Sequence, residues 1–205
     1  MSEPLRVAVL VSGSGTNLQS LLDAAASGDL GSARVVGVIS NRPGAGALLR
    51  AERAGVPALV LDHKSFADRA AFDAALREGV TSLGADLVVL AGFMRVLTPV
   101  FLDAFAGRVI NIHPSLLPSF PGVDAQGQAF AHGVKVTGCT VHFVDAGLDS
   151  GPIISQSAVP VRDDDDAETL RARILVEEHR LLREVVRDLA EGRLRREGRR
   201  VLRRP

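Results

Sequence analysis

Apolar, β-branched runs alternate with helical stretches along this chain, and that alternation restricts the fold more than any other feature. The strand-like runs are Arg6–Val11, Arg34–Ile39, Ala58–Leu61, Asp86–Ala91, Arg108–His113, Lys135–Val144 and Pro152–Val161. The helical stretches are Asn17–Ala26, Ala45–Ala54, Ala67–Gly79 and Glu168–Glu191. The early strand–helix pairs recur at roughly 25-residue intervals, a spacing typical of parallel strands joined by right-handed helical crossovers.

The alternation predicts an α/β fold with an open, mostly parallel twisted sheet and helices on both faces. Only the short turn Asp145–Gly151 separates the last two strands, which indicates an antiparallel hairpin added to the sheet in the C-terminal half. The chain has 205 residues, 46% of them apolar, which is enough to bury a substantial core. We therefore expect one domain over residues 1–205 that ends in a basic tail, 193–205.

The composition excludes several classes of protein. Lys and Arg together number 24, as do Asp and Glu, so no overall field attracts nucleic acid or an anionic membrane. Seven arginines fall in Arg193–Arg204, where a solvated tail or an edge hairpin is the simpler interpretation. Cys139 is the only cysteine, which excludes an intrachain disulfide and favours a reducing compartment. With no signal-peptide pattern and no apolar run near the roughly 20 residues that span a bilayer, we expect a cytoplasmic protein.

An amide and an imidazole stand two residues apart at the end of one predicted strand. Residues at i and i+2 on a strand face the same way, so Asn111 and His113 share one face. Pro114 cannot donate to a strand ladder and therefore ends the strand, which leaves His113 at its rim. The carboxyl ends of parallel strands are where open α/β sheets bind ligands. For an isolated Asn-x-His, a polar strand end exposed to solvent would be the better interpretation.

The first strand leads into a glycine-rich loop, Ser12–Asn17, and then into a helix. Glycines allow a ligand to approach the backbone closely, and the free amides at a helix N-terminus favour an anion. The dinucleotide fingerprint fits badly, because its third glycine falls at Leu18 and the second strand ends without an acidic residue. A P-loop lysine is also missing. The loop therefore fits a single phosphate, with an ordinary capped turn as the alternative.

Two further loops are candidate pocket walls. Gly92–Pro99 is unusually apolar for a loop, so it either walls a pocket for a flat organic ring or only covers the core. Ser115–Gly122 is punctuated by prolines, and we treat the segment through Gln128 as loop.

A carboxylate and a second histidine follow in the C-terminal half. Asp149 lies in a glycine-bracketed turn, and a carboxylate near an imidazole can form a proton-transfer pair, although spacing alone does not decide whether it meets His113. His142 is more simply a core histidine. These three residues and Cys139 could in principle bind zinc, but no short ligand motif is present, so we expect no metal.

Taken together, four segments resemble the phosphoribosylglycinamide formyltransferase family, the folate-dependent enzymes of purine biosynthesis. The segments are the glycine-rich loop, Leu90–Arg95, Asn111–Pro118 (Asn-Ile-His-Pro-Ser-Leu-Leu-Pro) and Asp145–Gly151. The resemblance extends in order from about Val7 to about Gly192. The Asn-x-His-Pro-Ser-Leu-Leu-Pro motif with a downstream Asp is specific to enzymes that use formyltetrahydrofolate, and the glycine-rich loop selects this family among them.

The resemblance implies a role for each matching residue. Asn111, His113 and Asp149 would be the catalytic trio. The substrate phosphate would be held by Gly15, Thr16 and Asn17 in an N-terminal half of about 1–100, and the ribonucleotide also by Glu178. Folate would be held in a half of about 90–192 by Arg69, Met94, Arg95, Val96, Leu97, Asn111, Asp145, Ala146, Gly147, Leu148 and Asp149.

The same resemblance implies the reaction and the partners. The formyl group of 10-formyltetrahydrofolate, a co-substrate, would pass to the amine of glycinamide ribonucleotide with no metal and no covalent intermediate. Partners would be these two small molecules, with no nucleic acid and no membrane, in a monomer or a homodimer.

Three alternatives follow from related or simpler proteins. A formyltetrahydrofolate hydrolase would have an N-terminal regulatory domain, for which a strand beginning near residue 6 leaves no room. Transfer to initiator methionyl-tRNA would need a further C-terminal domain and a basic face. A noncatalytic phosphate-binding module would bind the anion alone, without a folate.

Overall fold

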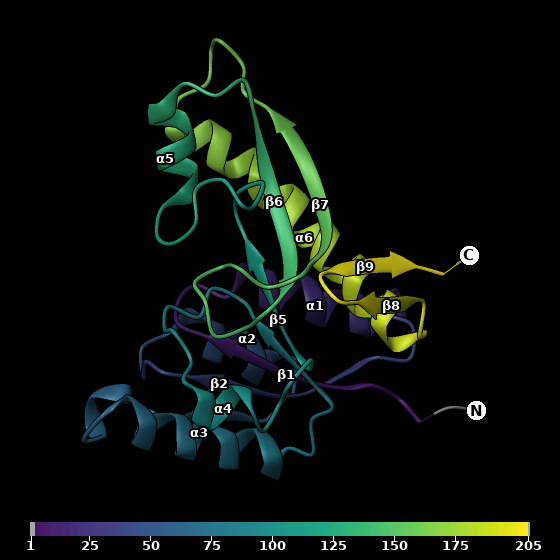
Figure 1. Cartoon of the computed structure of the whole chain (residues 1–205). Helices are drawn as coiled ribbons and strands as arrows, with labels where there is room; N and C mark the ends of the chain where they lie inside the picture. The colour runs from purple at the N-terminus through teal and green to yellow at the C-terminus, as the bar shows by residue number, and fades with distance from the viewer. Residues whose placement is uncertain (1–2, 205) are drawn as a thin grey trace.

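A seven-stranded sheet organises the structure, with its strands in the order β3-β2-β1-β4-β5-β6-β7 (Figure 1). The computed structural model describes residues 3–204. The strands of the sheet are β1 (Arg6–Val11), β2 (Arg34–Ser40), β3 (Ala58–Val60), β4 (Leu87–Leu90), β5 (Val109–His113), β6 (Val136–Phe143) and β7 (Ile153–Pro160). The helices are α1 (Thr16–Ser27), α2 (Gly46–Arg53), the 3₁₀ turn η1 (His63–Ser65), α3 (Arg69–Ser82), α4 (Pro99–Leu102), α5 (Ala125–His132) and α6 (Ala167–Ala190).

The direction of the strands confirms the predicted fold class. β1 pairs in parallel with β2 and with β4, and the parallel pairing continues to β3 on one side and to β5 on the other. β6 pairs antiparallel with β5 and with β7, as expected for an added hairpin. The chain builds outward from β1 in one direction and then from β4 in the other. The carboxyl ends of β1 and β4 therefore flank the point where the strand order reverses, which is where open α/β sheets bind ligands.

Two apolar layers hold the helices against the sheet. On one face, α1, α2 and α6 bury their apolar side chains against residues such as Val7 and Val9. On the other face, α3 and α4 pack against the alternate residues of the same strand, Ala8 and Leu10. Because β1 is covered on both faces, its sequence is a continuous apolar run instead of an alternating one.

Side-chain caps set the beginnings of the two longest helices, α3 and α6. Asp68 accepts a hydrogen bond from the backbone N–H of Ala71 at 2.8 Å, so α3 begins at Arg69 instead of residue 67. Asp166 and Thr169 form a reciprocal capping box, and α6 begins at Ala167, one residue before the predicted start. The carboxylates before α6 thus mark a helix start, as their position indicated.

One sequence-based prediction is wrong, and one choice between two interpretations is resolved. The segment through Gln128, which we expected to be loop, contains the start of helix α5 at Ala125. This helix buries only Ala125 and Ala129, so its sequence has little hydrophobic periodicity from which to predict a helix. The predicted basic tail from residue 193 is a two-stranded hairpin, β8 (Leu194–Glu197) and β9 (Arg200–Arg203). Of the two interpretations considered for this segment, the hairpin is therefore the one observed.

Candidate active site

A cavity of about 600 Å³ opens at the carboxyl ends of β1, β4 and β5, where the strand order reverses. The β6–β7 loop and α6 complete its walls. Its lining includes most of the predicted site residues, namely Thr16, Asn17, Met94, Arg95, Val96, Leu97, Asn111, His113, Asp145, Gly147, Leu148, Asp149 and Glu178. The cavity is thus built from segments that are more than 160 residues apart in sequence, as the 161-residue separation of Asn17 and Glu178 illustrates.

Asn111, His113 and Asp149 converge at one side of this cavity. Asn111 and His113 lie on the same face of β5, as the strand periodicity predicted. The β6–β7 loop brings Asp149 to them. Its Oδ2 lies 3.4 Å from His113 Nδ1, and its Oδ1 accepts a hydrogen bond from Asn111 Nδ2 at 3.5 Å. The spatial relation that spacing alone did not decide is therefore a direct contact.

Both ring nitrogens of His113 face acceptors. Nε2 lies 2.9 Å from the carbonyl oxygen of Phe120, which can only accept, so Nε2 carries a proton. Nδ1 faces the carboxylate of Asp149, which is held in place by a 2.8 Å hydrogen bond from the backbone N–H of Gly122. Phe120 and Asp149 both have positive φ angles, of 53° and 49°, so backbone strain is concentrated where His113 is held.

His142 is a contact of the trio that the sequence analysis did not assign to the site. It is buried, as a core histidine would be, but its Nε2 lies 3.2 Å from Asn111 Nδ2 and 3.8 Å from Asp149 Oδ1. Nδ1 lies 2.9 Å from the carbonyl of Phe143, so Nδ1 is the protonated nitrogen and Nε2 accepts from the Asn111 amide. Burial lowers the pKa of His142, which favours this neutral form. His142 lies directly across from Asn111 on the neighbouring strand β6, and this pairing brings it to the site. The sequence does not fix the register of two paired strands, so it could not reveal this contact.

The glycine-rich loop leads directly into α1 at the other side of the cavity. Gly15 has a φ of 75°, and a Cβ there would lie 2.6 Å from the Cβ of Ala47, so both its conformation and its packing require glycine. Asn17, in the first turn of α1, donates from Nδ2 to Glu178 Oε2 at 2.8 Å, and both side chains are buried. The Oδ1 of Asn17 has no hydrogen-bond partner among residues 3–204.

Burial raises the pKa of Glu178 to about 7, against the smaller opposing effect of the hydrogen bond from Asn17. A pKa above the unfolded value of 4.5 gives stability that is present below pH 4.5 and is lost as pH rises through about 7. In the wild type, this carboxyl should lower the free energy of unfolding by roughly 3 kcal/mol as the pH rises from 4.5 to 8. We expect this decrease to be absent in Glu178→Gln. Urea melts across this range measure it.

The control for this measurement is Glu184→Gln, on the same helix but outside the cavity lining. That variant should keep the wild-type dependence of stability on pH. If the Glu178→Gln protein kept it as well, the buried carboxyl would not be its source.

The apolar loop after β4 forms a wall of the cavity. Leu97 is buried, whereas Met94 is 64% exposed and offers an apolar surface toward solvent. The backbone N–H of Met94 donates to Ser12 Oγ at 2.8 Å, and that hydroxyl donates to Asn41 Oδ1 at 2.6 Å. The apolar loop is therefore tied to Ser12 at the start of the glycine-rich loop, and through the Ser12 hydroxyl to Asn41 after β2. The sequence analysis did not single out these two buried side chains.

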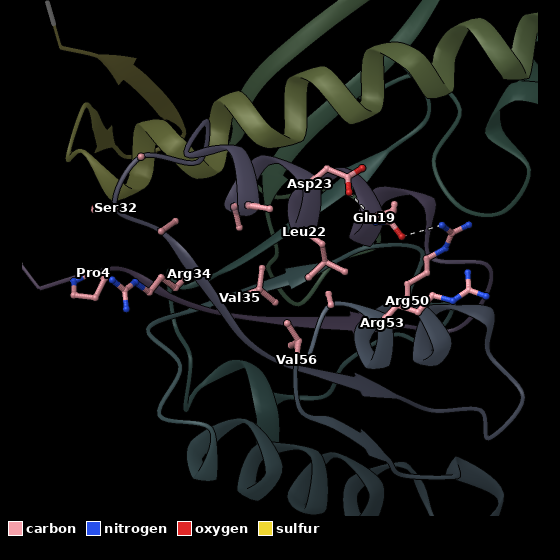
Figure 2. A pocket seen from close by; sticks show the side chains of 15 residues that line it. Pro4, Gln19, Leu22, Asp23, Ser32, Arg34, Val35, Arg50, Arg53 and Val56 are labelled. Atoms are coloured by element: carbon pink, nitrogen blue, oxygen red, sulfur yellow. Dashed lines mark hydrogen bonds between the residues drawn. The ribbon is translucent and has the colours of Figure 1, made fainter.

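Three predicted site residues do not line the cavity. Gly15 and Ala146 are neighbours of lining residues, whereas Arg69 is exposed at the start of α3 and lies outside the cavity. A second hollow of about 970 Å³ lies between α1, α2 and the start of β2 (Figure 2). Arg50 and Arg53 stand at one end of it and Arg34 at the other. It contains none of the predicted site residues.

Comparisons with known proteins identify the family of this chain. The family model described as formyl transferase matches residues 5–186. The chain belongs to the formyl transferase family. The match contains β5, the β6–β7 loop and most of α6, so every residue of the trio lies in the part shared with the family.

Individual members of the formyl transferase family are closely similar. The phosphoribosylglycinamide formyltransferase of Mycobacterium tuberculosis is 51% identical over 92% of this chain and 86% of its own length. The crystal structure of glycinamide ribonucleotide transformylase 1 from Symbiobacterium toebii has a TM-score of 0.97 and 56% identity over 100% of this chain and 96% of that one. The trifunctional purine biosynthetic protein adenosine-3 of Drosophila melanogaster is 53% identical over 85% of this chain, which spans only 13% of that longer protein.

Two kinds of feature are absent from the part of the chain that the structure describes. Within residues 3–204, no group of three or more His, Cys, Asp or Glu side chains is arranged to hold a metal ion. Among the same residues, no helix combines the length and the apolar character that a membrane crossing requires.

Proposed function

We propose that this chain transfers the formyl group of 10-formyltetrahydrofolate to the amine of glycinamide ribonucleotide, a step of purine biosynthesis. The observation that carries the proposal is the convergence of Asn111, His113 and Asp149 in a cavity that also contains the glycine-rich loop. Relatives whose names state this activity support it.

The chemistry requires donors for an oxyanion. The amine nitrogen attacks the formyl carbon, a new C–N bond forms, and negative charge grows on the formyl oxygen before the bond to N10 of the folate breaks. Asn111 Nδ2 and His113 Nδ1 face Asp149 at 3.5 and 3.4 Å, longer than typical charge-assisted hydrogen bonds, so both can turn to the oxyanion. Preorganised donors of this kind usually make the greatest single contribution to the rate enhancement of an enzyme.

A proton must also move from the attacking nitrogen to N10. Asp149 is the group that accepts it, directly or through an ordered water, while it orients the imidazole of His113. His142 is a positioning residue in this scheme, because its neutral Nε2 fixes the Asn111 amide. The steps need no metal and no covalent intermediate.

We assign the substrates to the two halves of the cavity. The phosphate of the ribonucleotide is assigned to the backbone and side chains of Gly15, Thr16 and Asn17, in the N-terminal half of about 1–100. Glu178, which α6 adds to this side of the cavity, is assigned to the same substrate. The pterin of the folate is assigned to the apolar wall Met94–Leu97 and to the loop Asp145–Asp149, in a half of about 90–192. Arg69 has no place in this assignment, because it lies outside the cavity.

The test is an assay with both substrates. We expect tetrahydrofolate and formylated ribonucleotide to appear in equal amounts, and no release of formate without the ribonucleotide. Release of formate to water at a comparable rate would show a hydrolase instead. Binding of a phosphate ester without any binding of the folate would contradict the proposal and show an anion-binding module.

Removal of the Asn17 side chain tests the phosphate-loop assignment. We expect Asn17→Ala to raise KM for the ribonucleotide about tenfold with little change in kcat, because contacts present in both ground and transition states affect mainly binding. Initial rates at saturating folate measure this. The exposed Asp23, farther along α1 and outside this cavity, gives a matched control as Asp23→Ala. An unchanged KM for the ribonucleotide in the Asn17→Ala protein would contradict the assignment of the phosphate to this loop.

A further inference from the structure

We infer that the C-terminal hairpin β8–β9 positions the loop that carries Asp149, and that Arg199 is the residue through which it acts. The inference rests on the proposed role of Asp149. The hairpin lies outside the region that the family model matches, which ends at residue 186. It is therefore a feature that the family assignment does not explain.

The hairpin is firmly attached to the body of the protein. Asp188, near the end of α6, is buried and forms ion pairs with Arg193, at 3.3 Å, and with Arg203. A buried carboxylate is costly unless it is paired, so these contacts fix β9 through Arg203 and the chain just before β8 through Arg193. Leu194 and Val201 pack against the apolar core, and β9 contacts β7 (Figure 1).

From this anchored position the hairpin reaches both ends of the loop between β6 and β7. The guanidinium of Arg199 donates from Nη2 to the carbonyl oxygen of Ser150 at 2.7 Å. The guanidinium of Arg196 lies over the ring of Phe143, with Cζ 5.8 Å from the ring centroid. Phe143 ends β6 and Ser150 is near the start of β7, so the two arginines hold the two stems of the loop.

The path from Arg199 to the trio is short. Ser150 follows Asp149 directly, and Asp149 has a positive φ, which requires support from its surroundings. Next to Ser150, a Cβ on Gly151 would lie 1.8 Å from the carbonyl oxygen of Phe143, so the two stems are in direct backbone contact. Movement of the Ser150 carbonyl therefore changes the backbone that aims the Asp149 carboxylate at His113 and at the N–H of Gly122.

The first test compares two arginines of the same hairpin. Arg199→Ala should lower kcat about tenfold, since an ångström of misplacement at a reacting centre can cost about a hundredfold, and should leave KM for the ribonucleotide within about twofold. Arg200 is exposed on β9 and its side chain makes none of the hydrogen bonds found among residues 3–204, so Arg200→Ala should match the wild type. Arg199→Lys keeps a donor and should restore part of the lost kcat.

The second test does not depend on activity. The Gly122 amide donates to Asp149 Oδ2, so its hydrogen exchange reports whether that carboxylate is in place. Exchange at Gly122 should be faster in Arg199→Ala than in Arg200→Ala, at equal thermal stability. Wild-type exchange together with wild-type kcat in Arg199→Ala would overturn the inference.

A double variant separates this inference from the proposed function. If Arg199 acts through Asp149, then Arg199→Ala should cause no further loss of kcat in an Asp149→Asn background. A full additional tenfold loss would overturn the inference and leave the proposed function intact. Normal turnover in the single variant Asp149→Asn would contradict the proposed function. Hydrogen exchange at Gly122 in Arg199→Ala would still test the action of the hairpin.

Discussion

The variant Asp149→Asn is expected to lower kcat about a thousandfold. An asparagine preserves the size of the side chain but cannot accept the proton that leaves the attacking nitrogen, and general acid–base catalysis contributes about 10²–10⁴-fold. It also replaces the charge that faces His113 Nδ1 at 3.4 Å. Steady-state rates of formyl transfer at saturating concentrations of both substrates measure the loss.

The matched control removes a carboxylate outside the cavity. Asp163 is exposed and pairs with Lys135, so Asp163→Asn should keep the wild-type kcat. Thermal melts establish that both variants are folded. Turnover within tenfold of the wild type in a folded Asp149→Asn protein would show that the carboxylate does not move the proton.

The variant Asn111→Ala is expected to lower kcat by about 10²–10³-fold. Loss of one donor to an oxyanion costs about 3 kcal/mol in other enzymes, and that donor acts mainly in the transition state, so KM should change little. The alanine also leaves the Nε2 of His142 without its partner. Single-turnover rates with preloaded substrates isolate the chemical step.

An amide outside the cavity provides the comparison for Asn111. Gln128 lies on α5 and donates to the carbonyl of Val123, so Gln128→Ala removes an amide without touching the trio. It should have normal kinetics. If Asn111→Ala retained more than a tenth of the wild-type rate, then the amide would not be the principal oxyanion donor.

Much of the fold could be predicted because local patterns agree with the tertiary structure. The strand at residues 6–11 is apolar at every position that is covered on both faces, and Asp166 begins α6 as its position before the helix indicated. Helix α5 was missed because it buries a narrow face of two alanines and contains a glycine. The hairpin β8–β9 was left open between two interpretations, because its arginines could equally be solvated.

The amino-acid sequence alone was enough to predict the order of the seven sheet strands and of four helices, the shared face of Asn111 and His113, and the strand end that Pro114 sets. These are local properties, fixed by side-chain periodicity and by the backbone chemistry of proline and glycine. Which distant groups meet depends on the tertiary structure. The approach of Asp149 to His113, the pairing of His142 with Asn111 and the burial that raises the pKa of Glu178 to about 7 depend on strand register, loop conformation and exclusion of water. Those quantities arise from the packing of segments far apart in the chain, so no local pattern encodes them.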